Sequence, residues 1–181
     1  MFLIFELRGF TVMNEYLECG YIIKIHGLNG GLVINHLCDS YDAFACIKKL
    51  YFKANDGSFS GLKVRKCSPY KGGALVLLDT VTDADKASAL RGKSVFAHRS
   101  EVPCDEGSFF IVDLIGLDVF DIDSGVKYGT LKDVINSGAQ DIYVVEGEGG
   151  RLSYVPAIEE FVKEISLEKG IFIRPIEGMI E

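Results

Sequence analysis

Residues 17–35 read LECGYIIKIHGLNGGLVIN, which is two apolar runs on either side of a glycine-rich turn. Alternate residues of a β-strand point to opposite faces of its sheet. The first run therefore predicts a strand with one fully buried side, made of Cys19, Tyr21, Ile23 and Ile25, opposite a side with Glu18, Gly20, Ile22 and Lys24. Because glycine readily adopts the positive φ of tight turns, the stretch predicts two strands joined by a turn.

The turn HGLNGG, residues 26–31, sets a histidine beside three glycines and raises the alternative of a catalytic or phosphate-binding loop. A P-loop has the spacing GxxxxGK[ST], and a dinucleotide-binding loop has GxGxxG before a helix. The turn matches neither spacing, and no long helical pattern follows it. We interpret it as a turn between two barrel strands, with His26 helping to fix its conformation.

Short β-prone segments with turn residues between them continue along the chain. Asn55-Asp56-Gly57 is a strong hairpin signal. A helix is predicted over residues 84–91, capped by Asp83 and ended by Gly92, and a second short helix is predicted after Pro156. Many short strands with regular turns are typical of an all-β sandwich or barrel and not of βαβ units.

Charge divides the 181-residue chain in two. Residues 13–99 hold 12 Lys/Arg and 8 Asp/Glu, a net charge of +4, whereas residues 100–181 hold 6 and 17, a net charge of −11. The change falls within HRSEVPCDEGS, residues 98–108, a polar stretch typical of a linker. We predict a domain at 13–99, a linker at 100–107 and a second domain at 108–181, with residues 1–12 an extension from an alternative start codon.

Three basic residues, Lys63, Arg65 and Lys66, follow one another in a predicted strand. Lys63 and Arg65 alternate with Leu62 and Val64, so both are expected on the outward face, where they would contact RNA phosphates. The alternative is an ordinary solvated face. A basic half can approach nucleic acid, while an acidic half favours basic protein partners.

Other candidate sites fail on spacing. Asp121 and Asp123 do not continue into a calcium loop, because Gly125 and Lys132 occupy two of its ligand positions, so an Asp-rich β-turn is predicted. The five cysteines lack CxxC spacing, which indicates reduced thiols and no zinc site. With no GxSxG elbow and the three histidines on separate segments, no catalytic residues are assigned.

No apolar run approaches the roughly 18–20 residues of a membrane span, and a cytoplasmic protein is expected.

Six motifs in order resemble the RimM family of small-subunit ribosome maturation factors. They are ECGYIIKIHGLNGGLVI (18–34), ALRGKSVFA (89–97), FFIVDLIGLDVFD (109–121), GTLKDVINSGAQDIYVV (129–145), YVPAIEEFVKEISLEKGIFI (154–173) and EGMIE (177–181). The resemblance implies an all-β fold of two small β-barrels, a translation-factor-like N-terminal barrel and a C-terminal PRC barrel. It also implies a non-enzymatic assembly factor that needs no cofactor or metal.

The resemblance further implies partners and contact residues. The expected partners are the head of the small ribosomal subunit and its small-subunit ribosomal protein nineteen, bound by a monomer that also assists rRNA maturation. The family's aromatic pair, usually Tyr-Tyr, falls on Phe109 and Phe110. The family's HG turn falls on His26, Gly27, Leu28 and Gly30, which are candidates for partner contact. Two alternatives stay open: an adaptor for another basic protein, and a hydrolase using the Asp-rich turn.

Overall fold

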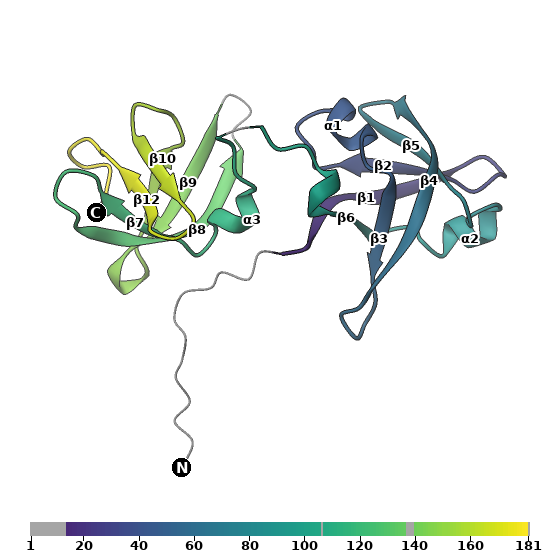
Figure 1. The fold of residues 1–181 in the computed structure, drawn as a ribbon, viewed down its shortest axis with the longest axis horizontal. Coiled ribbons are helices and arrows are strands. Elements are labelled where there is room, and N and C mark those ends of the chain that lie inside the picture. Colours follow the sequence, from purple (N-terminus) through teal and green to yellow (C-terminus); the bar gives the residue numbers. More distant parts are fainter. Residues whose placement is uncertain (1–13, 106, 137–139, 181) are drawn as a thin grey trace, which may run out of the picture. The chain divides into compact units, whose positions relative to one another are not determined.

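The computed structural model describes residues 14–105, 107–136 and 140–180. The chain divides into two compact units, one spanning Asn14–Glu106 and the other containing Gly107–Glu181 (Figure 1). Both are built mainly from β-strands. Within the described ranges, no helix is long and apolar enough to cross a bilayer.

The first unit is a closed six-stranded barrel. Its strands are β1 (Tyr16–His26), β2 (Gly31–His36), β3 (Lys49–Lys53), β4 (Phe59–Tyr70), β5 (Gly73–Leu78) and β6 (Ser94–His98). Neighbours around the barrel follow the order β1-β2-β5-β4-β3-β6, and β6 pairs with β1 to close it. The predicted hairpin at Asn55-Asp56-Gly57 joins β3 to β4, and Gly57 has the expected positive φ of 85°.

The side chains of β1 do not alternate as predicted. Tyr21 and Ile23 are exposed, at 40% and 46%, while Ile22 is fully buried. The cause is two irregularities in strand pairing, one between Glu18 and Gly20 and one between Ile22 and Lys24. A β-bulge adds one residue to a strand and so shifts the alternation by one position. The prediction of one continuous buried side is therefore wrong.

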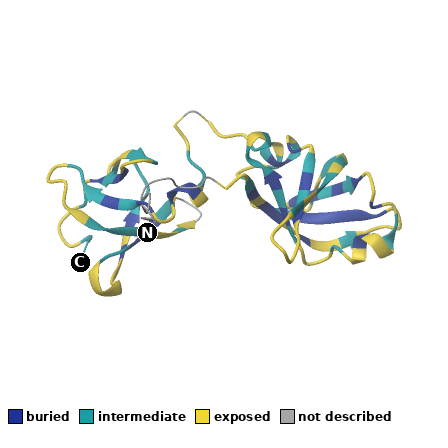
Figure 2. Cartoon of the chain, turned by 60° about the horizontal axis from the view of Figure 1, so that its bottom comes forward, coloured by how far each residue is buried: buried dark blue, intermediate teal, exposed yellow. Residues whose placement is uncertain are grey.

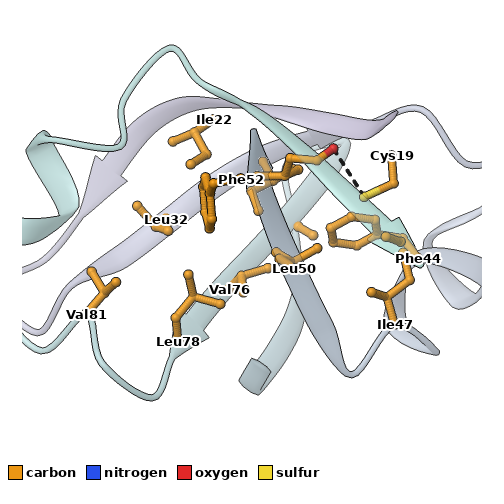
Figure 3. Close-up of a cluster of buried hydrophobic side chains, with 14 of the residues drawn as sticks. Cys19, Ile22, Leu32, Phe44, Ile47, Leu50, Phe52, Val76, Leu78 and Val81 are labelled. Atoms are coloured by element: carbon orange, nitrogen blue, oxygen red, sulfur yellow. Dashed lines mark hydrogen bonds between the residues drawn. The ribbon is translucent and has the colours of Figure 1, made fainter. Parts of the chain in front are cut away.

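The barrel encloses a single apolar core (Figure 3). Side chains from all six strands and from the connecting segments contribute to it, including Ile22, Leu32, Ile34, Leu50, Val76, Leu78 and Val95, each 0% exposed. Cys19 lies in this core, and its Sγ donates a hydrogen bond to the carbonyl oxygen of Val95 at 3.4 Å. The barrel thus presents its polar side chains to solvent, on the outer faces of the strands.

Two short helices connect barrel strands. In α1 (Tyr41–Ala45), Ser40 Oγ accepts a hydrogen bond from the backbone N–H of Ala43 at 3.1 Å. In α2 (Ala84–Ser88), Asp83 Oδ1 accepts one from the N–H of Lys86 at 2.8 Å, which confirms the predicted cap. The helix α2 is shorter than predicted, because turns already begin after Ser88. A 3₁₀ turn, Arg99–Glu101, follows β6.

The second unit contains a six-stranded sheet in the order β10-β9-β8-β7-β12-β11. Its strands are β7 (Asp118–Asp121), β8 (Lys127–Asn136), β9 (Asp141–Glu146), β10 (Leu152–Pro156), β11 (Val162–Ser166) and β12 (Gly170–Ile173). All neighbours are antiparallel except β7 and β12. The short helix α3 (Ile111–Leu114) precedes β7, and a 3₁₀ turn, Glu148–Gly150, precedes β10.

The buried residues of this sheet, dark blue in Figure 2, form a second apolar core. Val119, Leu131, Val155, Ile171 and Ile173 are each 0% exposed. The helix predicted after Pro156 is wrong, because that segment forms a turn followed by the strand β11. Tertiary pairing with β12 buries part of β11 and overrides its helical propensity.

Candidate binding surfaces

The glycine turn between β1 and β2 exposes an apolar tip. Leu28 is 83% exposed, the most of any large apolar residue in the described ranges. Gly27 and Gly30 have φ of 67° and 74°, the left-handed region that favours glycine. The predicted turn is confirmed, and an exposed leucine at its tip is suited to contact with a partner.

Gly30 also ties this turn to the rest of the barrel. It is buried, and a Cβ at this position would lie 2.1 Å from the carbonyl oxygen of Val81, in the segment between β5 and α2. Nothing lies within 4 Å of a Cβ built at Gly27. The sequence therefore needs glycine at 30 for space as well as for φ, and at 27 for φ alone.

His26 belongs to a small aromatic and basic cluster at the base of the turn. Its ring centroid lies 5.2 Å from that of Tyr70, at the end of β4, in an edge-to-face arrangement. Lys24 Nζ and Lys71 Nζ lie 5.5 and 5.8 Å from the Tyr70 centroid. Such cation–π contacts stabilise exposed sites modestly. The cluster fixes the end of β1 and keeps His26 exposed.

The aromatic pair lies where the second unit begins, and its two members differ. Phe109 is half-buried and packs against the core of the second unit. Phe110 is also half-buried and precedes α3, its carbonyl oxygen accepting a hydrogen bond from the N–H of Asp113 at 2.9 Å. Phe109 thus has a structural contact with the core of the second unit, which Phe109→Ala would remove.

An apolar strip that the sequence did not single out follows this pair. Ile111, Val112 and Ile115 are 48%, 43% and 39% exposed. In the sequence they belong to the apolar run FFIVDLIG, which is typical of a buried segment. No signal in the sequence marks these three side chains as exposed. Exposed apolar side chains grouped in this way mark interaction sites.

The three predicted basic residues are all exposed on β4. The pairing of β4 with β5 shifts between Val64 and Lys66, so Arg65 and Lys66 both face outward although they are consecutive. Lys63 lies directly across from Lys49 on β3. The structure therefore adds Lys49 to this basic face.

The Asp-rich segment after β7 is a turn held by its own carboxylates, as predicted. Asp121 Oδ1 accepts hydrogen bonds from the backbone N–H of Asp123 at 3.0 Å and of Ser124 at 2.6 Å, and Oδ2 accepts one from Tyr128 Oη at 2.8 Å. Asp123 binds the guanidinium of Arg174 through two hydrogen bonds of 2.8 and 2.7 Å. In the described ranges, no group of three or more His, Cys, Asp or Glu side chains is arranged to hold a metal ion.

These hydrogen bonds make the stability of the second unit depend on pH. The backbone N–H of Ser124, with help from Tyr128, lowers the pKa of Asp121 from 3.8 to about 2. The folded state therefore binds this proton less tightly than the unfolded chain, so the stabilisation is complete above about pH 4 and is lost as the pH falls through 2.

Asp121→Asn, which mimics the protonated carboxyl, is therefore expected to lower the melting temperature at pH 6 and to approach the wild type near pH 2. Thermal melts between pH 2 and 6 measure the difference. Glu148→Gln, at an exposed carboxylate of the same unit, controls for the lost charge. A difference that stays constant down to pH 2 would contradict the prediction.

The cysteines differ sharply in accessibility. Burial raises the pKa of the Cys19 thiol far above its usual range and that of Cys38 to about 11, whereas Cys46 is exposed. Because the thiolate is the reactive form, we expect iodoacetamide at pH 8 to label Cys46 within minutes and to leave Cys19 unlabelled until the barrel unfolds. Peptide mass spectrometry checks this. Labelling of Cys19 in the native protein at the rate of Cys46 would show that the barrel opens locally.

Two family models match the chain in succession, the RimM N-terminal domain over residues 17–102 and the PRC-barrel domain over residues 106–178. A ribosome maturation factor RimM of Clostridioides difficile (strain 630) is 34% identical over 170 residues, which cover 92% of this chain and 96% of that protein. The chain belongs to the RimM family. The resemblance drawn from the six motifs is thereby confirmed, as is the two-domain, mostly β architecture.

Other RimM proteins match over similar lengths. The ribosome maturation factor RimM of Caldicellulosiruptor bescii is 29% identical over 174 residues, covering 93% of this chain and all of that protein. A crystal structure of a 16S ribosomal RNA processing protein RimM from Pseudomonas aeruginosa aligns with 89% of this chain at 20% identity and a TM-score of 0.45. The RimM family consists of non-enzymatic ribosome maturation factors, which agrees with the prediction of no catalytic residues.

Proposed function

We propose that this chain is a ribosome maturation factor that binds the immature small ribosomal subunit and assists processing of its 16S rRNA. The relation to ribosome maturation factors over more than nine-tenths of the chain, through both domains, carries the proposal. The protein acts in the cytoplasm as a monomer, by binding alone. It holds a head protein and its rRNA site in a state competent for assembly, and then leaves.

The acidic second unit is the part that binds a head protein, and small-subunit ribosomal protein nineteen is the proposed partner. Residues 107–181 hold 6 Lys/Arg and 14 Asp/Glu, a net charge of −8, which favours a basic protein, because complementary charge speeds association and disfavours wrong partners. Phe110, Ile111, Val112 and Ile115 supply apolar contacts of the kind that dominate binding energy at interfaces. Charge and apolar surface thus occur together in this unit.

The first unit contacts rRNA in this proposal, through the basic residues of β4. Lys63, Arg65 and Lys66 are exposed on β4 and suited to phosphate oxygens, whose neutralisation releases counterions. The exposed Leu28 at the tip of the glycine turn, with Gly27, Gly30 and His26 shaping it, adds a partner contact. Each unit then recognises a different component of the subunit.

A pull-down with the tagged full chain tests the function. Recovery of free or immature small subunits, with little of the mature 70S ribosome, is the expected result. Enrichment of a different basic protein without any small subunit would contradict the proposal and favour an adaptor that uses the same acidic unit.

A further inference from the structure

Five aromatic rings meet on the outside of the first barrel, beside the basic face of β3 and β4. Tyr16 stacks on Phe59 with ring centroids 4.3 Å apart and an interplanar angle of 17°. Tyr16 also lies 4.8 Å from Tyr51 and 5.7 Å from His98, and Phe59 lies 5.2 Å from Phe96. We call these five residues the aromatic platform. Each is half-buried, so each retains exposure to solvent.

Strand alternation places the platform on the outer face. On β3, Leu50 and Phe52 enter the core, so Tyr51 points outward. On β6, Val95 and Ala97 enter the core, so Phe96 and its second neighbour His98 point outward. Tyr16 pairs with His98, and Tyr51 pairs with Phe96. The platform therefore crosses four adjacent strands, β1, β6, β3 and β4.

The platform is ordered before any partner arrives. Gly61 on β4 lies across from Tyr51, and a Cβ built there would be 2.7 Å from Tyr51 Cε1 and 2.3 Å from Lys49 Cε. The Tyr51 ring and the Lys49 stem thus lie over the bare backbone of Gly61. A ring held in this way loses little conformational freedom on binding, which favours affinity.

Lysine side chains line one side of the platform. Lys49 Nζ lies 4.8 Å from the Tyr51 centroid, and Lys53 Nζ lies 6.0 Å from that of Phe59. Lys63 pairs directly with Lys49. The acidic side chains lie toward β1, where Glu15 Oε1 is 3.2 Å from His98 Nε2 and Glu18 pairs with Phe96. The basic side of the platform is therefore formed by β3 and β4.

We infer that the aromatic platform binds a single-stranded segment of RNA. Unpaired bases take the place of the Lys49 and Lys53 ammonium groups over the rings of Tyr51 and Phe59. The two lysines then contact the phosphates, together with Lys63. Rings beside a positively charged groove are the means by which single strands are held without strict sequence preference. This inference rests on the proposed function for its choice of RNA and adds which form of RNA is bound.

Two alternatives fit the platform less well. Bases within a duplex are already stacked on each other and leave no faces for the rings, and proteins read RNA duplexes by shape and through phosphate and 2′-OH contacts. Protein interfaces are depleted in lysine, whereas here two lysines lie over the rings themselves. Lysine beside an exposed ring suits a ligand that carries a phosphate for every base.

Fluorescence anisotropy tests the inference, using the full chain and a labelled, unstructured, pyrimidine-rich RNA of ten nucleotides. Tyr51→Leu/Phe59→Leu removes the ring faces and keeps apolar bulk, and should weaken binding about 10-fold or more, given the usual effect of losing a stacked base. Phe120→Leu/Phe172→Leu is the matched control, because these half-buried rings also stack, with centroids 5.6 Å apart, but lie in the second unit. It should change affinity less than 2-fold.

The contribution of the lysines is measured separately, from the salt dependence of RNA binding. Lys49→Gln/Lys53→Gln should lower the slope of log affinity against log salt by about 1.4, since each phosphate contact on a single strand contributes about 0.7. Equal affinity of the wild type and the Tyr51→Leu/Phe59→Leu variant would overturn the inference. An equal loss of affinity in Phe120→Leu/Phe172→Leu would also overturn it, as would a duplex of the same sequence that binds as tightly as the single strand. If the double variant has a lowered melting temperature, the RNA affinities of Tyr51→Leu alone and of the lysine variant test the inference instead.

Failure of this inference and failure of the proposed function are distinguishable. If the wild type recovers small subunits but does not bind the single-stranded RNA, the platform contacts something else, such as a protein, and the inference is overturned while the function stands. If it binds the RNA but recovers no small subunits, the proposed function fails and the single-strand site stands.

Discussion

Gly30→Val is expected to lower the free energy of unfolding of the first unit by about 2–5 kcal/mol, the sum of two costs. A left-handed φ costs a residue with a side chain about 1–2 kcal/mol. Forcing atoms into a packed position costs about 1–3 kcal/mol more. Gly30 has both problems, since its φ is 74° and its Cβ would lie 2.1 Å from the carbonyl oxygen of Val81. Because this oxygen belongs to the backbone, no side-chain rotation can make room for the new Cβ.

Gly27→Val is the matched control in the same turn. Its φ of 67° brings the same strain, but nothing lies within 4 Å of its Cβ, so we expect a loss of only about 1–2 kcal/mol. Urea denaturation of both variants measures the two free energies. Equal losses would show that the segment around Val81 moves to make room and that Gly30 is needed for φ alone.

Ile111→Asp/Ile115→Asp is expected to reduce recovery of small subunits about 30-fold or more while leaving the fold intact. The two side chains are 48% and 39% exposed, so their replacement should change the free energy of unfolding by about 0.5 kcal/mol or less each. Truncating an apolar anchor at an interface typically costs about 2 kcal/mol or more, which corresponds to this loss in affinity. Two added negative charges do not suit a partner contact made of apolar groups.

Val126→Asp is the control for the apolar strip. Val126 is 56% exposed in the same acidic unit, but it follows the end of β7, whereas α3 precedes the beginning of that strand. The variant should recover subunits as well as the wild type does. Undiminished recovery by the Ile111→Asp/Ile115→Asp protein would exclude the strip as the contact and would leave Phe110 to be tested alone.

Local features of the fold were predictable from the sequence. The hairpin at Gly57, the cap at Asp83 and the turn at Asp121 depend on residues within four positions of one another, and each forms as expected. The displaced buried side of β1 and the strand β11 were not predictable. Both depend on which strands pair. Bulges shift the alternation of buried and exposed side chains in β1, and pairing with β12 keeps the segment after Pro156 extended.

Some features of the candidate surfaces could likewise be predicted from the sequence, and others could not. The outward positions of Lys63 and Arg65 follow from alternation, and the tip at Leu28 follows from turn chemistry. Lys66 is exposed because the pairing of β4 with β5 shifts beside it. The apolar strip does not, because an apolar run such as FFIVDLIG normally signals burial. The aromatic platform requires the register of four strands, which no local pattern from Tyr16 to His98 contains.

The closure of the barrel determines when the aromatic platform can exist. β1 and β6, the first and last strands of the unit, pair with each other, and Tyr16 meets His98 across that seam. A growing chain that has reached only β5 holds Tyr16, Tyr51 and Phe59 but lacks Phe96 and His98. Contacts this distant along the chain form late in folding. The complete platform therefore appears only on a finished barrel, in which Tyr16 and Phe96 pack against the Phe59 ring.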